Sequence, residues 1–140
     1  MKKKHRLSVS GVVVGLLVVA GGGGTYGALL TTRVVAPADG ASVPERPFVE
    51  GTASDPTATV WVVIRPMEGS DYWVQPPVTV RVTGAWKVQV YIGRPGNLDI
   101  GKHFEVKAVA NPKQPLAEGY VLDAWPEAEA ISQVIEVSRR

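Results

Sequence analysis

The sequence predicts an all-β domain, folded as an antiparallel β-sandwich of about seven strands and preceded by one N-terminal transmembrane or signal helix. Three observations predict it. Residues 59–93 place apolar side chains on alternate positions, which is the period of a β-strand. Turn residues recur about every 8 to 12 residues, as in sandwiches. A single long apolar run, residues 7–30, carries no charge. We therefore expect a leader at residues 1–32 and a β-domain at residues 33–140.

The leader begins with a basic cluster at residues 2–6. A helix rises about 1.5 Å per residue, so the uncharged run that follows is long enough to cross a hydrocarbon core of about 30 Å. One interpretation is an uncleaved anchor that leaves the C-terminal domain outside the cytoplasm. The other is a secretory signal peptide that is removed. The apolar residues at 26–30 favour the anchor, and thus a single-pass membrane protein, with a secreted protein as the alternative.

Glycines in the leader are spaced for close helix packing. Gly11 and Gly15 have the small-residue spacing that lets two membrane helices approach each other. This spacing predicts a weak homodimer formed through the anchor.

The predicted strands follow in order along the chain. Short β-prone segments at 31–35 and 48–52 precede residues 59–65, which are apolar on both faces and suit a central strand. Residues 72–75 form the next strand, and Pro76-Pro77 ends it because proline donates no ladder hydrogen bond.

A hairpin follows, in which Thr83-Gly84 supplies the turn. Its first strand is expected to place Val78, Val80 and Val82 on one face, and its second strand buries Trp86 and the alternate residues after it. Further strands are predicted at 104–110 and 131–137. The connection at 114–130 is long, so we expect a short helix or an extra strand near residues 116–122.

Charge and composition exclude several classes of function. The first six residues hold four of the 15 Lys and Arg residues, which leaves 11 basic against 13 acidic residues, a formal net of −2, in the rest. A nucleic-acid interface needs clustered cations, so none is expected. The chain has no Cys, which excludes disulfides, thiol catalysis and a lipid-modified cysteine.

The residues of common catalytic sites are missing or isolated. His103 is the only histidine outside the leader, and alternation places it opposite Phe104 on the solvent face. A Ser-His-Asp arrangement would depend on it. Four acidic residues of the late part of the chain show no glycosidase signature: Glu118, Asp123, Glu127 and Glu129. The sequence therefore predicts no enzyme and no cofactor.

A metal site is not expected either. Asp39, Asp55 and Asp99 lie near predicted strand ends, but they lack the spacing of a calcium loop. Aspartate in such positions more commonly forms turns.

Aromatic side chains are the best candidates for a ligand site. Trp73 and Trp125 are expected at the surface, the latter in a long loop where binding residues often collect. Tyr72 and Tyr120 accompany them. Such a platform suits sugar rings or a protein partner, whereas packing is the commoner role of Trp. Trp86 and Trp61 are assigned to the interior.

Several short motifs resemble those of bacterial extracellular immunoglobulin-like (fibronectin III-like) domains across residues 33–138. They are Pro37-x-Asp39-Gly40 with Val43 and Val49-x-Gly51, Gly84-x-Trp86-x-Val88-x-Val90, Phe104-Glu105-Val106-x-Ala108, and Ser132-x-x-Ile135-x-Val137. The resemblance implies an immunoglobulin-like sandwich. Such domains act as spacers, adhesion modules or accessory domains, so the expected function is non-catalytic binding or scaffolding, with an unknown protein partner. The alternative is a module that binds carbohydrate or cell wall.

Overall fold

The computed structural model describes residues 29–140. Within these residues the chain forms eleven β-strands and no helix, so the all-β prediction is confirmed for this part. None of its elements is a helix that could span a bilayer. The predicted leader helix, with Gly11 and Gly15, lies outside the described residues.

The strands form two sheets. The small sheet is antiparallel, in the order β1 (Thr32–Ala36), β3 (Phe48–Ala53), β7 (Ala85–Gln89) and β6 (Thr79–Val80). The large sheet has the order β2 (Ala41–Val43), β11 (Ile135–Arg139), β8 (His103–Pro112), β4 (Val60–Pro66), β5 (Tyr72–Val74) and β9 (Val121–Leu122). β10 (Ala128–Ile131) pairs with β8 next to β11. Only β2 and β11 are parallel.

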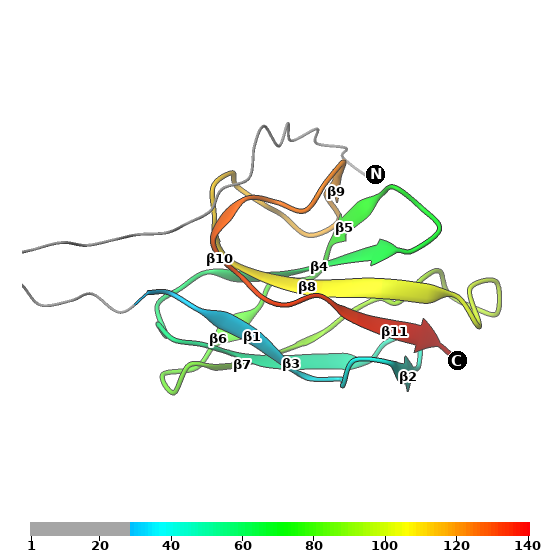
Figure 1. Ribbon diagram of the computed structural model, residues 1–140, viewed down its shortest axis with the longest axis horizontal. Coiled ribbons are helices and arrows are strands. Elements are labelled where there is room, and N and C mark those ends of the chain that lie inside the picture. Colours follow the sequence, from blue (N-terminus) through cyan, green and yellow to red (C-terminus); the bar gives the residue numbers. More distant parts are fainter. Residues whose placement is uncertain (1–28) are drawn as a thin grey trace, which may run out of the picture.

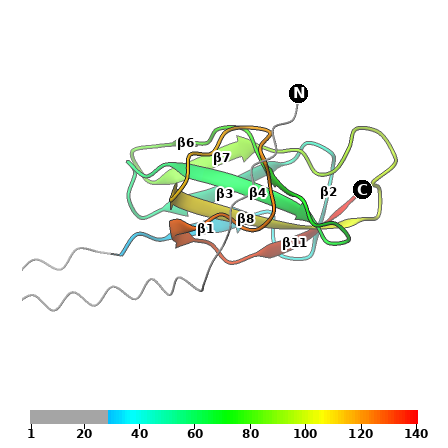
Figure 2. The same cartoon turned by 90° about the horizontal axis from the view of Figure 1, so that it is seen from above.

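The two sheets pack face to face, and Figure 1 shows them as two layers, with β3 and β7 below β4 and β8. Figure 2 shows the same layers from above, with β3, β4 and β8 running in similar directions. The core contains Val49 and Trp86 from the small sheet, and Val62, Val106 and Val137 from the large sheet. The alternation that buries Trp86, Val88, Val90 and Ile92 is confirmed. Apolar burial on this scale is the main stabilising contribution in such folds.

A second apolar cluster covers the outer face of the large sheet. Val63 and Leu122 are fully buried there, and Trp61 packs against them. The long connection between β8 and β10 folds back over this face (Figure 1) and contributes β9. The expected extra strand near residues 116–122 is therefore present, as β9. Because this connection covers the outer face of the large sheet, the central strand β4 is apolar on both faces.

The β6–β7 hairpin has the predicted turn but a shorter first strand. Gly84 has φ of 88°, which a glycine adopts without strain, and its N–H donates to the Arg81 carbonyl at 2.8 Å. The turn thus begins at Arg81, and β6 ends at Val80. Val82, predicted to share a buried face with Val78 and Val80, is instead 92% exposed. That prediction was wrong because Val82 belongs to the turn.

The described residues form eleven strands, whereas about seven were predicted. One reason is that β2 and β9 are only three and two residues long, too short to show an alternating pattern in the sequence. In addition, β10 and β11 are one strand interrupted by a bulge. Ile131 lies opposite Val109 and Ile135 lies opposite Val106, so this strand has one residue more than β8 between the two pairs. The Ser132 hydroxyl accepts a hydrogen bond from the Ala108 N–H at 2.8 Å and satisfies the interrupted ladder.

Candidate functional site

A groove of about 640 Å³ opens at the end of the sandwich where the chain terminates. We call it the Trp73 groove. Its walls come from β5, from the loop between β4 and β5, and from the loop between β7 and β8, and both loops lie at the right-hand end in Figure 1. The side chains that carry the argument below are Ile64, Trp73, Gln75, Tyr91, Arg94 and Phe104. Most of the groove surface is apolar, which is typical of ligand pockets.

Two aromatic side chains, Trp73 and Tyr91, line the groove. Adjacent residues of a strand point to opposite faces of the sheet. Tyr72 packs against the second apolar cluster, so Trp73 points away from that cluster and toward the groove. Tyr91 follows β7 and is 43% exposed. The Arg46 guanidinium lies 3.7 Å from the centre of the Tyr91 ring, so a cation–π contact holds this ring in place. The groove is therefore lined by two aromatic rings, and the orientation of the Tyr91 ring is fixed by Arg46.

Gln75 links the backbones of Trp73 and Tyr91 through hydrogen bonds of its side-chain amide. Its side chain is buried. The amide nitrogen donates to the Trp73 carbonyl at 3.2 Å, and the amide oxygen accepts from the Tyr91 N–H at 2.8 Å. A buried polar group that is satisfied on both atoms fixes local geometry. The distance between the Trp73 and Tyr91 backbones is thus set before any ligand arrives.

Charged residues form a paired network at the rim. Asp99 is buried and accepts hydrogen bonds from the Arg94 backbone N–H at 2.6 Å and from its guanidinium at 2.9 Å. The Lys102 ammonium lies 3.2 Å from Asp99 and 2.9 Å from Glu68. The hydrogen bonds from Arg94, followed by the contribution of Lys102, hold the pKa of Asp99 well below its usual range. Asp99 therefore stays ionised, and its bonds to Arg94 and Lys102 join the two sides of the loop between β7 and β8.

The loop between β7 and β8 is also fixed by a buried arginine. The Arg139 guanidinium donates to the carbonyls of Ile92 at 2.8 Å, Arg94 at 2.9 Å and Gly96 at 2.6 Å. It also reaches the Glu45 carboxylate at 3.3 Å. These bonds replace the sheet ladder that the loop lacks. Sequence reasoning missed both Arg139 and the structural role of Asp99.

The other predicted aromatic residues lie on the opposite face of the large sheet. Tyr72 and Trp125 meet edge to face, with ring centroids 4.8 Å apart. Trp125 and Tyr120 pack against the second apolar cluster and are half-buried. The Lys107 ammonium lies 4.8 Å from the Trp125 ring, and burial lowers the pKa of Lys107. The structure thus separates Trp73 from Trp125, and a shared platform does not form.

The residues weighed for catalysis are scattered. His103 is exposed on β8, where its Nδ1 lies 3.1 Å from a Glu136 carboxylate oxygen. Glu129 accepts a hydrogen bond from the Asn111 amide at 2.9 Å, whereas Glu118 lines the Trp73 groove. Residues 29–140 contain no group of three or more His, Asp or Glu side chains placed to hold a metal ion.

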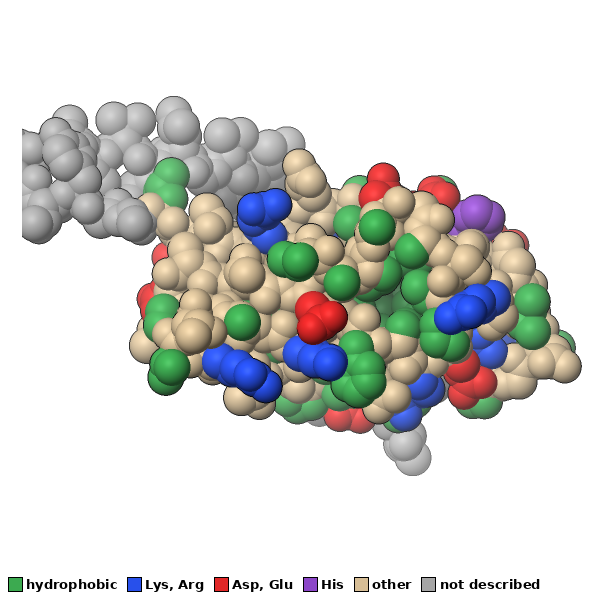
Figure 3. Space-filling model, turned by 90° about the horizontal axis from the view of Figure 1, so that it is seen from below, with side chains coloured by type: hydrophobic (Ala, Val, Ile, Leu, Met, Phe, Trp, Pro, Cys, Tyr) green, Lys and Arg blue, Asp and Glu red, His purple; other side chains and the backbone are tan. Residues whose placement is uncertain are grey.

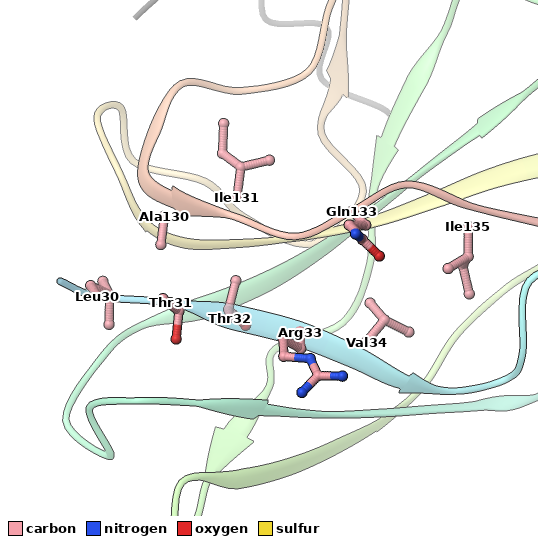
Figure 4. A pocket seen from close by; sticks show the side chains of 9 residues that line it. All are labelled: Leu30, Thr31, Thr32, Arg33, Val34, Ala130, Ile131, Gln133 and Ile135. Carbon is pink, nitrogen blue, oxygen red and sulfur yellow. The ribbon is translucent and has the colours of Figure 1, made fainter. Parts of the chain in front are cut away.

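A second opening, of about 530 Å³, lies between the two sheets on the side where β1 faces β10 and β11. We call it the β1 crevice. Figure 4 shows its lining side chains, among them Leu30, Val34, Ile131 and Ile135. None of the aromatic candidates lines it.

The charge on the face of the molecule shown in Figure 3 is mixed. On the face shown in Figure 3, Lys and Arg side chains lie among Asp and Glu side chains and are separated by neutral surface. This arrangement differs from the continuous basic field of a nucleic-acid interface.

No protein-family model matches the chain, and no curated protein matches it.

Proposed function

We propose that this chain is a membrane-tethered, extracytoplasmic binding module without catalytic activity, and that it holds a segment of a partner protein in the Trp73 groove. The proposal includes an immunoglobulin-like topology for the sandwich and an uncleaved N-terminal anchor. The observation that carries it is the groove itself, in which the backbones of the two aromatic residues, Trp73 and Tyr91, are linked by the buried Gln75. A site organised in advance loses less entropy when a ligand binds.

The position of the groove supports a tethered role. β1 starts at one end of the layers, whereas the Trp73 groove opens at the other end, where the chain terminates (Figure 1). With an anchor before Leu30, the groove is directed away from the bilayer and toward partners. The scattered positions of His103 and the carboxylates support a role in binding rather than in bond breaking.

The chemistry of the groove favours a protein segment. Its surface is mainly apolar, and Pro66, Pro76 and Pro95 line it in addition to the two aromatic side chains. Arg94 and Lys102 at the rim are already paired with acidic groups, so they offer little to a strongly anionic ligand. Extended apolar segments dock in aromatic-lined grooves of this kind.

A photo-crosslinking experiment tests this function in intact cells. A benzophenone amino acid is placed at Ser70, which lines the groove, and in a control at Val82, which lies on the β6–β7 turn. We expect a discrete crosslinked species from position 70 only, and its loss when Trp73→Ala is added. Equal crosslinking from both positions, or a species that persists in Trp73→Ala, would contradict the proposal.

Carbohydrate binding is the second candidate, because the faces of Trp73 and Tyr91 suit sugar rings. A glycan array probed with the wild-type chain and with Trp73→Ala distinguishes the two ligand classes. Glycan binding that depends on Trp73, without the crosslinked protein, would favour the carbohydrate module.

A further inference from the structure

The β1 crevice is bounded by two strands that each have an unpaired edge. β1 is the outer strand of the small sheet, and β10 pairs only with β8. Within residues 29–140 no backbone hydrogen bond joins β1 to β10 or β11. Unpaired strand edges present N–H and C=O groups that readily pair with another strand. The side of the sandwich is therefore open along β1.

The register of β1 shows which backbone groups face the crevice. The Thr31 carbonyl accepts a hydrogen bond from the Ser54 N–H at 2.9 Å, so the backbone of Thr31 is directed toward β3. Alternate residues of a strand direct their backbone groups to opposite edges. Thr32 and Val34 accordingly direct theirs toward the crevice, which they also line.

The lining of the crevice is mixed, because Leu30, Val34, Ala130, Ile131 and Ile135 share it with Thr31, Thr32, Arg33 and Gln133. Val34 and Ile135 point toward one another across it in Figure 4. Of the large apolar residues that line the crevice, Ile131 is 47% exposed. A strand added at the edge of β1 would contact the apolar part of this lining and complete the hydrogen bonding of β1.

Arg33 gives the free edge of β1 a charge preference on the face that points away from β10 and β11 (Figure 4). It is the only charged residue of β1 and is exposed. No acidic side chain of residues 29–140 pairs with it. A carboxylate on an added strand, on the same face as Arg33, would supply the missing partner.

Strand β1 of a second copy does not suit this edge. β1 has no acidic residue to offer to Arg33 of another copy. Antiparallel pairing of β1 with its copy would also direct the two N-termini to opposite ends, so that both chains could not enter one membrane. The second argument rests on the proposed tether, whereas the first does not.

We infer that an extended segment of a second protein adds to β1 as a further strand, with alternate apolar residues in the crevice and a carboxylate beside Arg33. This surface is separate from the Trp73 groove. Recognition combines main-chain hydrogen bonds with alternate side-chain contacts, as in other cases of strand addition.

A designed peptide tests the inference with the full-length chain in detergent micelles. The probe is a labelled, end-capped heptapeptide, Thr-Val-Glu-Val-Thr-Val-Thr, and the control peptide carries Lys in place of Glu. Binding is followed by fluorescence anisotropy. We expect the Glu peptide to bind about fivefold more tightly than the Lys peptide, which corresponds to about 1 kcal/mol. Arg33→Glu should invert this preference.

Two further variants locate the binding site. Val34→Pro removes an N–H that faces the crevice, without removing a hydrogen bond to β3, and should weaken both peptides at least about tenfold. Trp73→Ala should leave peptide binding unchanged, because Trp73 does not line the β1 crevice. Peptide binding at β1 can therefore be tested independently of ligand binding in the Trp73 groove. If Val34→Pro fails to fold, the inference is tested by Arg33→Glu alone, through the reversed preference between the Glu and Lys peptides.

Three results would overturn the inference. They are the absence of saturable binding of the Glu peptide, a charge preference that Arg33→Glu leaves unchanged, and self-association of the chain that Val34→Pro abolishes. The last would identify a second copy as the occupant.

Discussion

The guanidinium of Arg139 donates a hydrogen bond of 2.6 Å to the carbonyl oxygen of Gly96, across 43 residues of sequence. Arg139 lies on the last strand, and Gly96 lies in the loop between β7 and β8, which lines the Trp73 groove. The arginine side chain is only 3% exposed, and its Nε has no hydrogen-bond partner in the described part of the chain. The shape of the groove thus depends on a residue next to the C-terminus.

Replacement of Arg139 should destabilise the domain and loosen this loop. Arg139→Met keeps the volume of the side chain but leaves the Ile92, Arg94 and Gly96 carbonyls without their donor. Loss of a buried, charged donor typically costs about 3 kcal/mol. Urea denaturation should show a decrease of this size in the free energy of unfolding. Arg140→Ala, at the exposed neighbouring residue, should change it by less than about 0.5 kcal/mol, and equal effects of the two substitutions would contradict this role for Arg139.

Stability should fall in acid because of Asp99. Its pKa is lower in the folded chain than in the unfolded chain, because Arg94 hydrogen bonds favour the carboxylate. The unfolded chain therefore binds the proton more readily as the pH drops below the ordinary value of about 3.9. The stabilisation is complete above that pH and is lost progressively below it. Urea midpoints measured between pH 7 and pH 2 should show this loss.

Asp99→Asn is the matched variant for this titration. It should be less stable than wild type at pH 7 by about 2 kcal/mol, since charge-assisted hydrogen bonds are lost. It should also lose less stability between pH 5 and pH 2. An acid profile identical to that of the wild type would show that other carboxylates cause the effect.

Gly51 is a position where any side chain would clash. A Cβ added there would overlap the Arg33 carbonyl oxygen and the Trp86 indole ring, both of which are fixed by packing. We expect Gly51→Ala to lower the free energy of unfolding by about 3 kcal/mol. Gly40→Ala is the control, because a Cβ at Gly40 meets no atom within 4 Å and only the φ of 85° opposes it. Its cost should be about 1 kcal/mol, and thermal denaturation can rank the two variants.

Trp125 and Trp73 should differ in their contribution to stability. Trp125 packs edge to face on Tyr72 and covers the outer face of the large sheet, so Trp125→Ala should cost about 2–3 kcal/mol. Trp73 borders an open groove, and Trp73→Ala should cost about 1 kcal/mol. Urea denaturation of both variants tests the order. A larger cost for Trp73→Ala would assign the packing role to Trp73 instead.

Strand alternation predicted the central part of the fold well. The 86–92 run has the burial expected of it, since Trp86, Val88, Val90 and Ile92 are buried and the residues between them are exposed. The error at Val82 arose because apolar alternation continues into the turn, where the hydrogen bond between Gly84 and Arg81 overrides it. Local pattern alone does not show where a hairpin stops pairing.

The sequence contained an indication that Trp125 packs against the large sheet. The central strand is apolar on both faces, so its outer face, with Trp61 and Val63, requires a cover. The long 114–130 connection is the segment that supplies this cover, together with Trp125. The Arg139 and Asp99 networks had no such signal. Arg139 bonds mainly to backbone carbonyls and to the distant Glu45, and Asp99 bonds to Arg94 and Lys102 in the same loop, and no residue pattern encodes these contacts.

The parallel pairing of β2 with β11 has a mechanical consequence. The first of these strands lies near the start of the domain and the second at its end, and their ladder is continued by the bonds from Gly40 N–H to the Glu136 carbonyl at 2.7 Å and from Arg140 N–H to the Val43 carbonyl at 2.9 Å. Tension applied between the start of β2 and the end of β11 pulls these parallel neighbours in opposite directions. The load then falls on all of these bonds at once, in shear, so the domain resists stretching along its own chain axis better than it would if the bonds opened one by one.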